Sequence, residues 1–325
     1  MVGTILLDKY GSAIVYRHAS GVMQPIVSVL LSVHNGGEWL RESVQSILGQ
    51  SFKNFELIIV NDGSTDCTGS VIHDFIIDPR IVWVEQEWMG LTRTLNRALG
   101  LARGQFIARQ DADDISLPKR FERQLAYFVK YPTTVMVGTH SRRIGEAPVE
   151  FRPTPALEPD EIRSILHDRN IFCHGTVMID RDAAGEELHY NDTFRYAQDV
   201  ELWCRFARKF ELRILPEALY LYRISKRSIT TLKLEEQCIY TALAIEAGRH
   251  KFCAYPLNFT DRSSMLRNLS NEARKILCRV LLINEAPRLA ANFFPIWHPA
   301  RLALRFMPSR GLRLMKKIRR LFCQI

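Results

Sequence analysis

The chain has 325 residues, of which 47% are hydrophobic and 24% charged, a balance that is typical of a folded globular protein and excludes a disordered one. Lysine and arginine number 44 against 35 aspartate and glutamate residues, so the formal net charge is +9. Residues 286–325 hold nine of these basic residues and no acidic one, which leaves residues 1–285 formally neutral. Because nucleic-acid binding needs basic residues spread over a folded face, this pattern argues against nucleic acid as a partner.

The cysteines and the first residues indicate a cellular location. Seven cysteines stand singly, without a Cys-x-x-Cys pair, and the odd count is typical of reduced thiols in a cytosolic protein. The N-terminal residues lack the pattern of a signal peptide, and no stretch approaches the roughly 20 apolar residues that cross a bilayer. We therefore expect a cytoplasmic protein without a spanning segment.

Residues 25–137 alternate short apolar runs with amphipathic ones, the pattern of βα units around a mostly parallel sheet. Strands are predicted at residues 26–33, 55–60, 81–84, 106–108 and 135–137. Helices are predicted at residues 38–48, 66–77, 91–102 and 118–130. Four prolines predict a loop at 141–160. The apolar pattern then predicts a helix at 199–210, a strand at 218–224 and helical structure from residue 234 onward.

Acidic residues follow two of these strands. Asp62 lies after the second strand, and Asp111, Asp113 and Asp114 follow the fourth. The carboxyl edge of an open α/β sheet is where ligands bind, and an Asp-x-Asp pair of hard oxygens suits Mn²⁺ or Mg²⁺ shared with a diphosphate. The alternative is a solvated acidic turn in which Asp114 caps the next helix, while Asn-Asp-Gly is also common turn chemistry.

Several segments, in this order and spacing, resemble the family 2 glycosyltransferases. They lie at residues 25–36, 46–52, 55–66, 90–96, 102–104 and 107–118, within a resemblance that covers about residues 25–225. The resemblance implies the GT-A fold, a Rossmann-like and mostly parallel α/β sheet flanked by helices. It also implies transfer of a sugar from a nucleoside-diphosphate donor, UDP-linked, with inversion, by an enzyme of the hexosyltransferase type.

The resemblance divides the chain into three parts. Residues 1–24 would be an N-terminal extension, and residues 25–232 the catalytic domain. Within that domain, the nucleotide-sugar half would span about residues 25–138 and the acceptor half about residues 139–232. Residues 233–325 would be a helical C-terminal region.

Roles for individual residues follow from the resemblance. Asp113 would contact Mn²⁺ or Mg²⁺ directly, with Asp111 on the ribose or on a metal-bound water, and the cation would stabilise the charge that grows on the leaving diphosphate. His34 stands where the family usually has tyrosine. Residues expected to bind the nucleotide sugar are Ser32, His34, Asn35, Glu38, Asp62, Asn96, Arg109 and Asp111.

Inversion in one displacement requires a base that takes the proton of the acceptor hydroxyl. By the resemblance this base is Asp199, and Gln198 stands where the family often has glutamate. His174, Gln198 and Trp203 are expected on the acceptor side. The residues alone leave two alternatives open: Asp199 could simply be favoured by the helix dipole, and His174 could be structural.

Residues 311–325 can form an amphipathic helix. One face would be apolar and the other would carry five basic residues, which is typical of a helix lying on an anionic membrane surface. Packing of this helix on the catalytic domain is the alternative. We expect a peripheral protein at the inner face of the cell membrane, acting on a glycan or lipid-linked acceptor in cell-surface polysaccharide synthesis.

Two other functions are alternatives to a glycosyltransferase. A nucleotidyltransferase would need a glycine-rich basic loop after the first strand, but residues 33–38 contain glycines without lysine or arginine. A non-catalytic nucleotide-sugar-binding or scaffold protein at the membrane would not need the full set of carboxylates.

Overall fold

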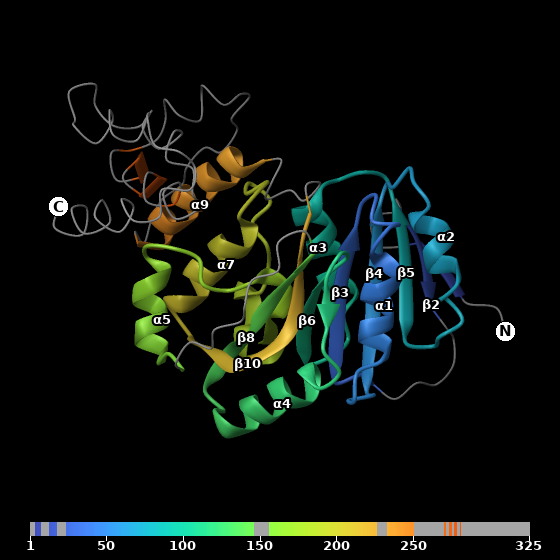
Figure 1. Cartoon of the computed structure of the whole chain (residues 1–325), viewed down its shortest axis with the longest axis horizontal. Helices are drawn as coiled ribbons and strands as arrows, with labels where there is room; N and C mark the ends of the chain where they lie inside the picture. The colour runs from blue at the N-terminus through green and yellow to red at the C-terminus, as the bar shows by residue number, and fades with distance from the viewer. Residues whose placement is uncertain are drawn as a thin grey trace.

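The computed structural model describes residues 4–7, 13–17, 24–145, 156–225 and 233–249, together with residues 270, 273, 274, 276, 277 and 280. These residues contain one mixed sheet of ten strands, in the order β1-β2-β5-β4-β3-β6-β9-β8-β10-β7 (Figure 1). The predicted amphipathic helix at 311–325 lies outside the described residues. None of the described helices is long and apolar enough to cross a membrane.

The centre of the sheet is parallel, as the sequence predicts. It consists of β3 (Val27–Val33), β4 (Phe55–Asp62), β5 (Ile81–Gln86) and β6 (Phe106–Asp111). The connecting helices are α1 (Leu40–Leu48), α2 (Thr68–His73) and α3 (Leu91–Leu101), and α4 (Arg120–Lys130) follows β6. These strands are buried on both faces because helices cover both sides.

The second half of the sheet extends further than predicted. β8 (Thr134–Gly145) and β10 (Glu211–Ile224) pair in parallel over most of their length. Residues 141–145, which the prolines placed in a loop, are therefore strand, because they pair with residues 220–224 across the sheet. The short strands β9 (Met178–Asp180) and β7 (Ile115–Ser116) pair antiparallel with their neighbours.

The N-terminal segment, for which no strand was predicted, adds to the sheet. β1 (Thr4–Leu7) and β2 (Ala13–Arg17) form an antiparallel pair, and β2 pairs with β5, so β1 is the edge strand on this side of the sheet.

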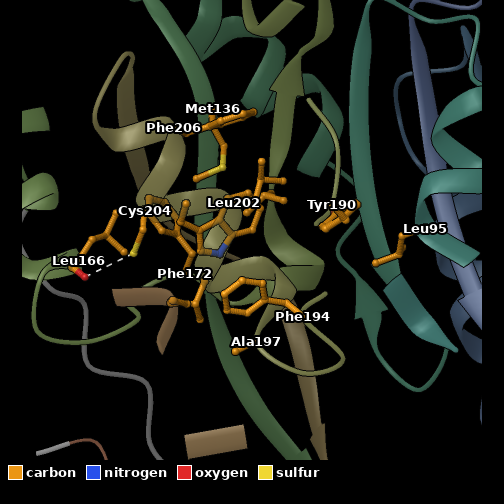
Figure 2. Packing of buried hydrophobic residues seen from close by; sticks show 14 of the residues in the cluster. Leu95, Met136, Leu166, Phe172, Tyr190, Phe194, Ala197, Leu202, Cys204 and Phe206 are labelled. Atoms are coloured by element: carbon orange, nitrogen blue, oxygen red, sulfur yellow. Dashed lines mark hydrogen bonds between the residues drawn. The ribbon is translucent and has the colours of Figure 1, made fainter. Parts of the chain in front are cut away.

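Two hydrophobic cores lie on opposite faces of the sheet. Alternate residues of the central strands face opposite ways, so that Leu30 and Ile58 enter one core while Leu31 and Ile59 enter the other. The first core, shown in Figure 2, is closed by α3, α5 (Pro159–Leu166), α6 (Arg181–Ala184), α7 (Gln198–Ala207) and α9 (Leu234–Arg249). The second is closed by α1, α2 and α4. Residues 273, 276, 277 and 280 also belong to the first core.

Candidate functional site

The carboxyl ends of three neighbouring strands bring most of the predicted residues to one edge of the sheet. Ser32 of β3 pairs with Asp111 of β6 on one side and with Val60 of β4 on the other. β4 runs two residues beyond its predicted end, so Asp62 is its last residue and pairs with Gln86. The parallel register therefore places the Asp62 and Asp111 backbones at the same edge, as expected for a ligand site in such a sheet.

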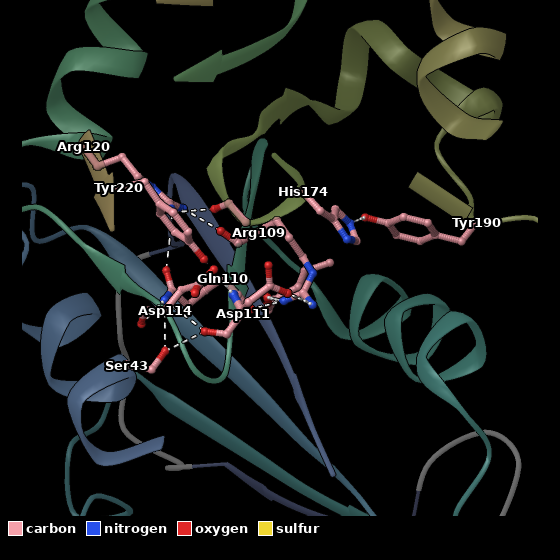
Figure 3. Close-up of polar contacts among 11 residues, drawn as sticks. Ser43, Arg109, Gln110, Asp111, Asp114, Arg120, His174, Tyr190 and Tyr220 are labelled. Carbon is pink, nitrogen blue, oxygen red and sulfur yellow. Dashed lines mark hydrogen bonds and ion pairs between the residues drawn. The ribbon is translucent and has the colours of Figure 1, made fainter. Parts of the chain in front are cut away.

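The acidic turn after β6 is held by polar contacts (Figure 3). The Arg109 guanidinium donates to Asp111 Oδ1 at 2.8 Å and to the Leu30 carbonyl at 3.0 Å. From α1, the Ser43 hydroxyl donates to the Asp111 carbonyl at 2.8 Å. Arg109 is predicted to bind the nucleotide sugar. In the structure its buried guanidinium pairs with the Asp111 carboxylate and orients it.

A second buried arginine, Arg120, contacts the strand that leads into this turn. Its guanidinium donates to the carbonyls of Arg109 and Gly175, both at 2.7 Å, and stacks over the Tyr220 ring at 5.4 Å. The Tyr220 hydroxyl in turn accepts the Asp111 N–H at 3.1 Å. Sequence reasoning missed both residues, because nothing in the local pattern distinguishes Arg120 from a solvated charge in the first turn of a helix.

Asp114 does not cap a helix, which corrects the alternative reading of the acidic turn. Its Oδ1 accepts the N–H of Arg223 on β10 at 2.7 Å, and the side chain is buried. The next helix, α4, begins after Lys119 without a side-chain cap. Asp114 therefore ties the acidic turn to β10.

Two carboxylates of this turn, those of Asp113 and Asp114, are unfavourable in their charged form. Loss of hydration, followed by the charge of Asp111, raises the pKa of Asp113 to about 6. Burial and the charges of Asp111 and Asp113 raise the pKa of Asp114 to about 8. Such crowded, poorly hydrated carboxylates attract a counter-cation.

The donor set of the turn suits a hard divalent cation. Carboxylate oxygens are the ligands that Mg²⁺ and Mn²⁺ prefer. Within the part of the chain that the structure describes, no group of three or more histidine, cysteine, aspartate or glutamate residues could hold a metal ion. The two carboxylates Asp111 and Asp113 thus fit a cation that takes its remaining ligands from substrate and water.

Asp199, the predicted base, lies in the first turn of α7. Burial raises its pKa to about 6, and the Asp111 carboxylate adds to the shift while Arg109 opposes it. The residue before the helix begins, Ala197, has a left-handed backbone with φ of 54°, one of two such non-glycine residues among those described. The other is Asn35, after β3 on the nucleotide side.

The predicted acceptor-side residues are partly or fully buried. His174 Nε2 lies 2.9 Å from the Tyr190 hydroxyl, and burial lowers the pKa of His174 to about 3, so its ring is neutral. Trp203 is fully buried, and its ring meets His174 edge to face at 5.9 Å between ring centroids. Gln198, at the start of α7, is also buried.

The predicted nucleotide-side residues differ in exposure. Glu38, like the two residues after β3, is exposed. His34 Nδ1 lies 2.7 Å from the Asp62 carbonyl, and Asn35 Oδ1 accepts the Thr65 N–H at 2.8 Å, so the loops after β3 and β4 are joined.

The Asp62 carboxylate, in contrast, is only 2% exposed. It accepts N–H groups of Met89 at 2.7 Å and Gly90 at 2.8 Å, as well as the Gln86 amide at 2.7 Å. In this structure Asp62 therefore holds the start of α3, directly beside the predicted nucleotide contacts.

Comparisons with known proteins identify relatives of this chain. The family described as "Glycosyl transferase family 2" matches residues 28–187. The chain is 37% identical over 207 residues to the putative glycosyltransferase EpsE of Bacillus subtilis, a match that covers 61% of this chain and 73% of EpsE. It is 32% identical over 209 residues to the O-antigen biosynthesis glycosyltransferase WbnJ of Escherichia coli, which covers 62% of this chain and 81% of WbnJ.

Solved structures share the fold at lower sequence identity. TarS of S. aureus in complex with UDP-GlcNAc is 16% identical, with a TM-score of 0.56 over 91% of both chains. The mannosyltransferase PcManGT of Pyrobaculum calidifontis, in complex with GDP-Man and Mn²⁺, is 20% identical, with a TM-score of 0.55 over 91% of this chain and 85% of that one. The chain accordingly belongs to glycosyltransferase family 2, and it is a glycosyltransferase with the GT-A fold.

Proposed function

We propose that this enzyme is a metal-dependent, inverting glycosyltransferase that moves a sugar from a UDP-linked donor to the hydroxyl of a saccharide or lipid-linked acceptor. One observation carries the proposal: the Asp111 carboxylate in the acidic turn and the Asp199 carboxylate in α7 are near enough to interact electrostatically. The proposal assigns cation binding to the first and the role of base to the second.

Asp199 is the base in this proposal. A carboxylate with a pKa near 6 is ionised at neutral pH yet more basic than an ordinary aspartate, which suits proton abstraction. The acceptor oxygen attacks the anomeric carbon as its proton passes to Asp199. The bond from that carbon to the diphosphate oxygen breaks on the opposite face, and the nucleoside diphosphate leaves with the bonding electrons.

The acidic turn is the donor-binding side. Asp113 and Asp111 would hold Mn²⁺ or Mg²⁺, which when bound offsets the charge that develops on the diphosphate. Arg109 fixes the orientation of Asp111, and in this proposal the exposed residues His34 and Asn35 bind the base and the ribose. The PcManGT complex with GDP-Man and Mn²⁺ and the TarS complex with UDP-GlcNAc support a nucleotide-sugar donor in this fold.

The biological setting is proposed from the relatives and the C-terminal charge. WbnJ is named for O-antigen biosynthesis, which favours a role in cell-surface polysaccharide assembly. The nine basic residues within 286–325 favour peripheral attachment at the inner face of the cell membrane, where a lipid-linked acceptor would be found.

The test is donor-dependent release of nucleoside diphosphate by the purified protein, over a panel of nucleotide sugars with and without Mn²⁺. We expect release with a UDP-sugar that depends on the cation. Asp199→Asn should lower the rate about 10²–10⁴-fold, the usual contribution of a general base, and leave nucleotide binding in place. If this variant and Asp113→Ala both turned over at the wild-type rate, the proposed mechanism would be wrong.

A further inference from the structure

The loop of residues 188–197 joins the middle of the chain to α7 and lies against α3. Asn96 of α3 holds this loop by its side-chain amide. Asn96 Oδ1 accepts the Tyr190 N–H at 2.8 Å, and its Nδ2 donates to the Tyr190 carbonyl at 2.8 Å. The second hydrogen of Nδ2 goes to Asp192 Oδ1 at 2.9 Å. Both hydrogens of the amide are thus used by the loop.

Thr92 provides a second attachment, one turn earlier on the same helix. Its buried hydroxyl donates to the Phe194 carbonyl at 2.8 Å. Residues four apart on a helix lie on the same side, so Asn96 and Thr92 together hold the loop against that side of α3. After Phe194, only residues 195–197 remain before α7 begins at Gln198.

The loop ends in a strained conformation next to the predicted base. The left-handed backbone of Ala197, with φ of 54°, costs free energy for a residue with a Cβ and persists only where its surroundings fix it. Asp199 follows two residues later, so its placement depends on how the preceding loop is held.

The residue that Asn96 holds, Tyr190, also contacts His174. Tyr190, whose backbone pairs with Asn96, places its hydroxyl 2.9 Å from His174 Nε2, and the two rings meet edge to face at 5.6 Å (Figure 3). One amide on α3 therefore supports two residues of the acceptor side.

We propose that Asn96 is a positioning residue for the acceptor side, acting through loop 188–197, rather than a ligand of the nucleotide sugar. The proposal rests on the proposed function, in which Asp199 is the base. The two roles predict different effects of replacing Asn96. Loss of a donor ligand would weaken nucleotide binding, whereas loss of a positioning residue would lower turnover and change the surroundings of Asp199.

The test variant is Asn96→Ala. We expect its Kd for UDP with Mn²⁺ to stay within about twofold of wild type. Its kcat should fall roughly 10–100-fold, because small displacements of a reacting group have large effects on rate. The acidic limb of the kcat–pH profile should also move to lower pH, since a less buried Asp199 has a more ordinary pKa.

Gly100→Ala tests whether the loss of kcat in Asn96→Ala is caused only by a loss of stability. Gly100 lies on the exposed side of α3, a Cβ added there would meet nothing within 4 Å, and alanine favours the helix. Alone, Gly100→Ala should raise Tm slightly and leave kcat unchanged. Combined with Asn96→Ala, it should recover part of the Tm but none of the kcat, and recovery of kcat in the double variant would reduce Asn96 to a stabilising residue.

Hydrogen–deuterium exchange gives a readout that does not depend on turnover. In Asn96→Ala, the amides of residues 188–199 should exchange faster, while those of residues 57–62 in β4 should not change. Unchanged exchange in the loop, or a large rise in the UDP Kd with normal kcat, would overturn the proposal. Failure of the proposed function would look different, because Asp199→Asn would then keep full activity whatever Asn96→Ala did.

Discussion

At the scale of single residues, Asp199 should control how the rate depends on pH. Burial raises its pKa to about 6, and a base works only when deprotonated. We expect kcat to fall about tenfold per pH unit below that value and to level off above it. His174, with a pKa near 3, stays neutral over this range and contributes no inflection. A rate that is flat between about pH 5 and 8 would remove Asp199 from the role of base.

Asp113 should make the metal-free protein less stable at neutral pH. Its pKa rises from 3.8 to about 6 in the folded state, so the folded state binds the proton more tightly than the unfolded state. The free energy of unfolding therefore decreases as pH rises from about 4 to about 6, and the ionised carboxylate remains unfavourable above that range.

Asp113→Asn removes this charge. In EDTA at neutral pH we expect it to raise Tm by a few degrees, since roughly 2–4 °C corresponds to 1 kcal/mol in a protein of moderate size. Mn²⁺ should raise the Tm of wild type and leave the variant unchanged. A variant that melts lower than wild type in EDTA would contradict this account of Asp113.

At the scale of elements, Arg120 joins four segments near the acidic turn. It donates to carbonyls from β6 and from the short turn at His174–Thr176, donates to the Ser116 hydroxyl of β7 at 2.8 Å, and stacks on Tyr220 of β10. Burial lowers the pKa of Arg120 to about 10, so it remains charged at neutral pH. Arg120→Met leaves these acceptors unpaired, and we expect a loss of about 2–4 kcal/mol in urea denaturation.

Arg123→Met on the same helix is the matched control. Arg123 forms an exposed ion pair with Glu217 and should change stability little, because water screens such pairs. Equal losses in the two variants would mean that Arg120 acts as an ordinary helix residue. A weaker Mn²⁺ response in Arg120→Met alone would show that its contacts also shape the acidic turn.

The sequence predicts local elements better than it predicts long-range contacts. The apolar runs that became β3 to β6 and the carboxylates at their ends could be recognised because burial on both faces leaves a continuous apolar pattern. The extension of β8 to Gly145 could not, since it depends on pairing with β10 about 80 residues later. For the same reason, the sequence does not reveal that Asp62 binds the start of α3 or that Asn96 binds Tyr190.

At the scale of the whole molecule, the net charge of +9 belongs to the C-terminal part of the sequence, which follows the residues that the structure describes. Residues 286–325 hold nine basic residues and no acidic one, while residues 273–280 still contribute side chains to the first core. A chain that ends at Glu285 therefore keeps every residue placed in the core and in the site. Each basic residue near an anionic surface contributes about 1 kcal/mol to binding, and salt weakens the attraction.

We expect the full chain to bind vesicles that contain anionic phospholipid and to dissociate as salt is raised, as measured by sedimentation with the vesicles. Deletion of residues 286–325 should abolish this binding and leave the Kd for UDP with Mn²⁺ unchanged. Replacing the five basic residues of 313–320 with glutamine in the full chain should weaken binding while keeping the apolar face. Vesicle binding that survives the deletion would mean that the C-terminal residues are not the membrane contact.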